Sequence, residues 1–133
     1  MAQESLVRGE IDAGARFAQA FNQYLPIRVA FWLKTGDSGL HYLYIASDQI
    51  NDRNFDVAYG EVMRIASQMP SIDFDAFRVK VINAANPLAR AAEAINDQYP
   101  APLGTRVGGQ MFGGTSIDSG YIYPPLSAVT APA

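Results

Sequence analysis

His41 is the only histidine of the chain and the residue best suited to general acid–base chemistry near neutral pH. A catalytic role requires a nucleophile within hydrogen-bond reach and a carboxylate that orients the imidazole. Asp37 and Ser38 are near it in the sequence, but this proximity does not bring the side chains together. The alternation around His41 points it towards the core, where a lone histidine is usually structural. We therefore assign no catalytic residue.

Two aspartates, Asp73 and Asp75, flank Phe74 just before a predicted strand. Alternate residues of an extended segment point the same way, so the two carboxylates have the spacing of a divalent-cation site. Such a site needs further oxygen ligands, and the sequence places none beside them. A solvated acidic loop is the simpler interpretation, and we predict no metal.

Cysteine is absent, which excludes a disulfide framework, a thiolate zinc site and a cysteine nucleophile. The glycines of residues 104–109 do not form a phosphate loop, because they follow a predicted helix and lack the required Lys-Ser/Thr ending. No cofactor is expected. The lack of cysteine also favours a reducing, cytoplasmic environment, and the N-terminus does not resemble a secretory signal.

Length and composition are those of one globular domain. The chain has 133 residues, of which 49% are hydrophobic and 17% charged. We predict a single domain over residues 1–123 and a flexible tail rich in Pro and Ala over residues 124–133. The net charge of −3 argues against nucleic-acid binding as the main role. No apolar run approaches the roughly 18 residues of a membrane span, so no membrane association is expected.

Hydrophobic periodicity predicts three helices and five strands. The predicted helices are 10–24, 55–69 and 86–99, and the predicted strands are 27–34, 40–46, 77–82, 105–112 and 117–123. Their order is α-β-β-α-β-α-β-β. All three helices have one apolar side, so we predict the α+β class: a two-layer sandwich with a mainly antiparallel sheet and the helices on one face.

Residues 35–39 supply a turn between the first two strands, and hydrophobic parity suggests their register. If Lys34 lies opposite Leu40, the aliphatic residues of both strands share one face, and Trp32 pairs with Tyr42. This face is the predicted core: Ile27, Val29, Phe31, Leu33, Leu43, Ile45, Phe77, Val79 and Val81.

The opposite face then becomes the candidate binding surface, because it combines aromatic and basic side chains. It would hold Arg28, Trp32, Lys34, Tyr42, Tyr44, Arg78 and Lys80, and Tyr121 and Tyr123 would join it by alternation. Aromatic residues and arginine are the types that anchor protein interfaces. Equally, cross-strand aromatic pairs and long basic side chains commonly cover a solvated sheet face without any function.

Three functions follow from these features. The first is a non-catalytic module that binds a protein partner or a second copy of itself through the aromatic and basic face. The second is binding of nucleic acid or another anion by Arg28, Lys34, Arg78 and Lys80. The third is a small enzyme of undetermined chemistry. The acidic net charge favours the first over the second.

Overall fold

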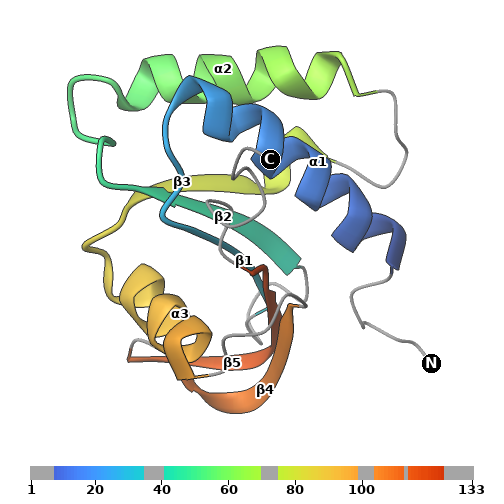
Figure 1. Cartoon of the computed structure of the whole chain (residues 1–133), viewed down its shortest axis with the longest axis vertical. Coiled ribbons are helices and arrows are strands. Elements are labelled where there is room, and N and C mark those ends of the chain that lie inside the picture. Colours follow the sequence, from blue (N-terminus) through green and yellow to red (C-terminus); the bar gives the residue numbers. More distant parts are fainter. Residues whose placement is uncertain (1–7, 35–40, 70–74, 99–103, 113, 125–133) are drawn as a thin grey trace, which may run out of the picture.

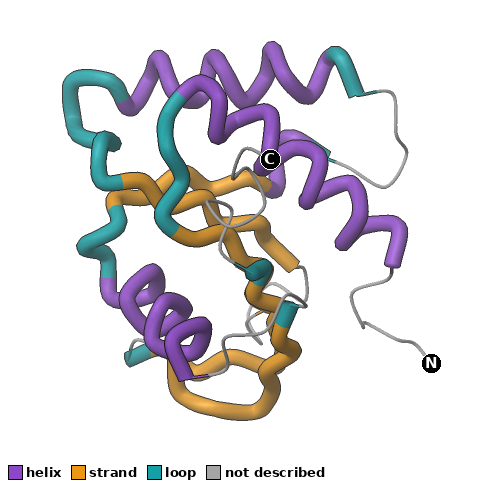
Figure 2. Tube along the Cα trace, viewed as in Figure 1, coloured by secondary structure: helices purple, strands orange, loops and turns teal. Residues whose placement is uncertain are grey.

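The computed structural model describes residues 8–34, 41–69, 75–98, 104–112 and 114–124 (Figures 1 and 2). Within these residues the elements follow the predicted order, with one 3₁₀ turn added at Ala76–Arg78. They are α1 Arg8–Tyr24, β1 Val29–Lys34, β2 His41–Ser47, α2 Phe55–Ser67, β3 Val79–Asn83, α3 Pro87–Gln98, β4 Thr105–Phe112 and β5 Thr115–Ile122. The predicted tail lies outside the described residues except for Pro124.

Local sequence signals account for the helices. The Asn86 side chain accepts a hydrogen bond from the N–H of Leu88 at 2.9 Å, so α3 begins with the expected cap, and Pro87 occupies its first position. The apolar stripe of α2 is buried at Ala58, Val62 and Ile65. No helix in the described part of the chain combines the length and apolar character needed to cross a membrane.

The described strands form one sheet in the order β3-β2-β1-β5-β4. The β1–β2, β1–β5 and β4–β5 pairs are antiparallel, and β2–β3 is parallel, with α2 as the connection between its strands. The α+β class and the mainly antiparallel sheet are therefore confirmed. Gly114 lies in the turn between β4 and β5 and has a φ of +85°. Glycine adopts positive φ angles readily because it has no Cβ atom.

The prediction that all three helices lie on one face of the sheet is wrong. α3 packs on the opposite face from α1 and α2 (Figure 1). On one side, Phe17 and Phe21 of α1 pack with Trp32 of β1. On the other, Ala89 and Ala92 of α3 pack against the opposite side of β1. The sheet thus lies between two helical layers, and β1 is buried on both faces.

The predicted register of the first two strands is wrong by one residue. Lys34 pairs with His41, Trp32 with Leu43 and Phe31 with Tyr44. A shift of one residue exchanges the two faces of a strand. Most of the predicted core is nevertheless buried, because both faces of β1 are covered, but Phe77 lies in the 3₁₀ turn and is 80% exposed.

A buried polar contact ties α1 to the centre of the sheet. Trp32 Nε1 donates to the Tyr123 hydroxyl at 2.8 Å, and that hydroxyl donates to the carbonyl oxygen of Ile11 at 2.6 Å. Burial raises the pKa of Tyr123, so the hydroxyl stays protonated at neutral pH. Gly14 of α1 packs directly over this contact, where a side chain would meet Tyr123 and Trp32.

Candidate functional site

The predicted aromatic and basic surface is not one surface. Trp32 is only 2% exposed and packs in the core shared with α1 and α2. Lys34, two residues along β1, lies on the same face of the sheet. Tyr42 and Tyr44 lie on the opposite face, which α3 partly covers. The physical reason is the register of β1 and β2, which places Trp32 beside Leu43 rather than Tyr42.

Tyr121 and Tyr123 do not extend the surface of Tyr42 and Tyr44 either. Tyr123 is buried in the core beneath α1, and Tyr121 is partly buried against that same core. Their rings contact each other edge to face, with centroids 5.2 Å apart. Tyr123, whose hydroxyl donates to the carbonyl oxygen of Ile11, therefore helps to hold α1 on the sheet.

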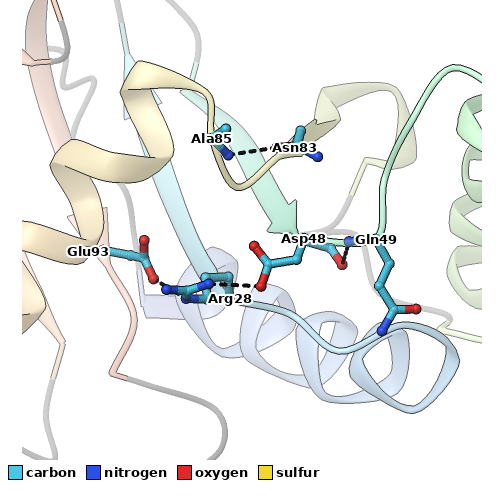
Figure 3. Close-up of polar contacts among 7 residues, drawn as sticks. Arg28, Asp48, Gln49, Asn83, Ala85 and Glu93 are labelled. Atoms are coloured by element: carbon cyan, nitrogen blue, oxygen red, sulfur yellow. Dashed lines mark hydrogen bonds and ion pairs between the residues drawn. The ribbon is translucent and has the colours of Figure 1, made fainter.

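Arg28 joins α3 to the end of β2 (Figure 3). Its guanidinium lies 2.8 Å from Asp48, just after β2, and 2.5 Å from Glu93 of α3. The hydrogen bond to Asp48 and the charge of Glu93 raise the pKa of Arg28. The Arg28 guanidinium is therefore already paired with two carboxylates.

Arg78 is held in a similar way. It lies 3.8 Å from Glu10 of α1 and 4.0 Å from Asp75. Asp75 also accepts a hydrogen bond from the N–H of Phe77 at 2.9 Å, so its carboxylate caps the 3₁₀ turn. Its expected neighbour, Asp73, lies outside the described residues. The cations needed for anion binding thus do not converge on one face.

The remaining candidates form a smaller surface, which we call the tyrosine strip: Tyr42, Tyr44 and Lys80. Tyr42 and Tyr44 alternate along β2, and Lys80 lies beside Tyr44 on β3. Among the described elements, α3 packs mainly over β1, β5 and β4 and covers the β2–β3 half of this face less. Both tyrosines are partly exposed and Lys80 is exposed.

Contacts within the sheet fix the geometry of the tyrosine strip. The Tyr44 ring stacks on Phe31 with centroids 5.2 Å apart and planes within 4° of parallel. The Lys80 amine lies 4.9 Å from the centre of the Tyr42 ring, within the range of a cation–π contact. Burial, followed by the nearby hydroxyls of Tyr42 and Tyr59, raises the pKa of Tyr44, which keeps its hydroxyl neutral and able to donate.

His41 is buried, as predicted, and has a partner that the sequence did not suggest. Its Nε2 lies 3.0 Å from the Ser119 hydroxyl of β5. The two residues are brought together by β1, because Lys34 pairs with His41 on one side and with Ser119 on the other. Ser38, the serine close to His41 in sequence, lies outside the described residues. Knowledge of the strand order would have been needed to find this pair.

The described residues contain no group of three or more His, Cys, Asp or Glu side chains arranged to hold a metal ion. Comparison of the chain with protein-family models, curated proteins and solved structures gives no significant match. The functional argument therefore depends on the tyrosine strip and on the His41–Ser119 contact.

Proposed function

We propose that this protein is an interaction module that binds a partner protein through the tyrosine strip. The observation that carries this proposal is the placement of Tyr42 and Tyr44 on a sheet face whose β2–β3 half is, among the described elements, the half that α3 covers less. Tyrosine is enriched in the centres of protein interfaces because it offers apolar area and a polar hydroxyl at a small entropic cost.

Preorganisation supports the proposal. The Tyr44 ring is already fixed by its stack on Phe31, and the Lys80 amine is close to the Tyr42 ring. Little conformational freedom would be lost when a partner packs on these rings. Lys80 also gives the strip a positive charge, which favours a partner with apolar side chains and a carboxylate. The cysteine-free sequence favours a cytoplasmic location for this interaction.

The first prediction tests the strip by photo-crosslinking in the cell that makes the protein. A benzoylphenylalanine placed at Tyr42 should yield a discrete adduct with one partner. The matched control carries the same group at Val57, which is 60% exposed on α2, on the other side of the sheet. We expect no adduct from Val57, and we expect Lys80→Glu to abolish the Tyr42 adduct. Absence of an adduct at Tyr42, or identical adducts from both positions, would contradict the proposal.

A second candidate function is covalent catalysis by a serine, favoured by the 3.0 Å contact between His41 and Ser119. Such a hydrogen bond is the starting geometry for a histidine that takes the serine proton as the oxygen attacks. A fluorophosphonate probe tests it, because attack on phosphorus forms an O–P bond, expels fluoride and passes the proton to His41.

This second candidate predicts labelling of Ser119 in the purified protein. Ser119→Ala removes the nucleophile and should give no label, whereas His41→Ala should slow labelling by about 10²-fold or more, the usual contribution of a general base. An unlabelled wild-type protein, or a label that is unaffected by His41→Ala, would leave His41 and Ser119 as a structural pair.

A further inference from the structure

Tyr123, which directly follows β5, is hydrogen-bonded to both helical layers of the protein. Its hydroxyl donates to the carbonyl oxygen of Ile11 in α1 at 2.6 Å and accepts from Trp32 Nε1 at 2.8 Å. Its backbone carbonyl oxygen accepts from the Asn96 side chain of α3 at 3.1 Å. Because α1 and α3 lie on opposite faces of the sheet (Figure 1), this residue connects two helices that the sheet separates.

The contact with α1 leaves Tyr123 little room to move. The residue is 5% exposed, and its hydroxyl lies so close to the α1 backbone that a Cβ atom on Gly14 would overlap it. Its N–H also donates to the carbonyl oxygen of Ala30 in β1 at 3.0 Å. A shift of Tyr123 would leave buried polar groups without partners, which is costly in a core. The docking of α1 therefore helps to set the position of the Tyr123 backbone.

On the opposite face, the attachment of α3 depends to a large extent on polar contacts. Its buried side chains are alanines, and its leucine and isoleucine are only partly buried. Alanine removes little apolar surface from water, so it contributes little to holding the helix on the sheet. Two polar contacts lie three residues apart on α3: Asn96 binds the Tyr123 carbonyl, and Glu93 lies 2.5 Å from the Arg28 guanidinium.

We propose that Tyr123 couples the docking of α1 to the docking of α3. When α1 separates from the sheet, the Tyr123 hydroxyl loses its acceptor and the ring loses the helix that covers it. The carbonyl oxygen of the same residue is then no longer held in place for Asn96, and the C-terminal half of α3 loosens. Because coupling between two equilibria is reciprocal, loss of the Asn96 contact weakens the attachment of α1 by the same factor.

This coupling goes beyond the proposed function and does not depend on it. The two helical layers respond together, so a ligand that binds one layer also shifts the conformational equilibrium of the other. α3 packs over β1, β5 and β4 on the face of the sheet that carries the tyrosine strip. An event at α1 therefore changes the surface beside the strip, on the opposite side of the sheet.

Hydrogen exchange in Tyr123→Phe tests the coupling. Phenylalanine keeps the ring and the backbone carbonyl that Asn96 binds, and removes only the hydroxyl that contacts α1. We expect the equilibrium constant for opening of the Ile95 and Asp97 amides of α3 to rise about fivefold or more, the lower end of typical coupling between two sites. The rise is measured relative to the amide of Ile45, which lies in the centre of the sheet and reports global unfolding.

Two further backgrounds locate the route of the coupling. Asn96→Ala removes the contact of α3 with Tyr123, so Tyr123→Phe should then change the opening of Ile95 and Asp97 by less than about twofold, the size expected for independent sites. Glu93→Gln is the matched control, because it weakens the other polar contact of α3 and leaves the Tyr123 contact in place. In the Glu93→Gln protein, Tyr123→Phe should keep its full effect.

Asn96→Ala alone tests the coupling from the other side, and it keeps the proposal testable if Tyr123→Phe fails to fold. The substitution lies on a partly buried position of α3 and leaves the contacts of the Tyr123 hydroxyl intact. By reciprocity, the opening of the Phe17 and Ala18 amides of α1 should rise about fivefold or more relative to Ile45.

Three results would overturn the coupling. They are α3 amides that Tyr123→Phe does not affect, an effect of equal size with and without the Asn96 side chain, and α1 amides that Asn96→Ala does not affect. The Tyr42 crosslink is measured in the wild-type chain, so loss of the coupling would leave the test of the tyrosine strip unchanged.

Discussion

Trp32→Ala should lower the free energy of unfolding by about 3–5 kcal/mol, the usual cost of truncating a large buried aromatic side chain. Trp32 is 2% exposed and packs between the sheet and α1. Its loss would also leave the Tyr123 hydroxyl without its indole donor. Because small domains are stable by about 5–15 kcal/mol, this substitution should remove a large share of the total. Denaturant unfolding followed by circular dichroism measures it.

Phe77→Ala is the matched control. The sequence predicted Trp32 on the exposed face and Phe77 in the core, and the structure shows the reverse. Phe77 is 80% exposed, so its truncation should change the free energy of unfolding by less than about 0.5 kcal/mol. A Trp32→Ala protein as stable as Phe77→Ala would contradict the buried position of Trp32. Because Trp32→Ala is expected to destabilise the fold, Trp32 is unsuited to mutational tests of binding.

Gly14→Ala should be destabilising by about 1–2 kcal/mol, although alanine is the better helix former. A Cβ atom at this position would overlap the Tyr123 hydroxyl and lie 3.0 Å from Trp32 Nε1. The hydroxyl cannot easily move, because it is hydrogen-bonded on both sides, to Trp32 and to Ile11. Overpacking of this kind costs about 1–3 kcal/mol, more than the gain of up to about 1 kcal/mol in helix propensity.

Gly60→Ala, in the middle of α2, should change the free energy of unfolding in the opposite direction. Nothing lies within 4 Å of the Cβ atom that alanine would add there. We expect this substitution to stabilise the protein by about 0.5–1 kcal/mol through helix propensity alone. Thermal unfolding of both variants separates the effects, and a Gly14→Ala protein that is stabilised as much as Gly60→Ala would show that α1 does not pack closely on Tyr123.

Patterns within single elements predicted the secondary structure, but they did not predict which faces are covered. The cap at Asn86 and the stripe of α2 are local features, and both are present as expected. The error arose in β1, where Val29 to Leu33 is apolar without interruption. A continuous apolar strand is typical of a sheet covered on both faces. Arg28 and Lys34 at its ends suggested an alternation that the middle of the strand does not have.

The alternation wrongly assumed for β1 also explains why only part of the candidate surface was predicted correctly. Tyr42, Tyr44 and Lys80 do share one face, because they lie on neighbouring strands in register. Trp32 and Lys34 were assigned to that face through a register that is wrong by one residue. The His41–Ser119 contact depends on β1 lying between β2 and β5. Strand order results from long-range packing, which no pattern along a single segment encodes.

The position of β1 between β2 and β5 also has a consequence for the time course of folding. β2 follows β1 closely in the sequence, so this pair can form early. β5, the other neighbour of β1, is far from it in the sequence. Trp32 of β1 and its hydrogen-bond partner Tyr123, which directly follows β5, are separated by 91 residues. Contacts of such long range slow folding, because loop-closure entropy must be overcome first. During synthesis, the side of β1 that pairs with β5 therefore stays without this partner until β5 has left the ribosome, and unpaired strand edges of this kind are prone to aggregation.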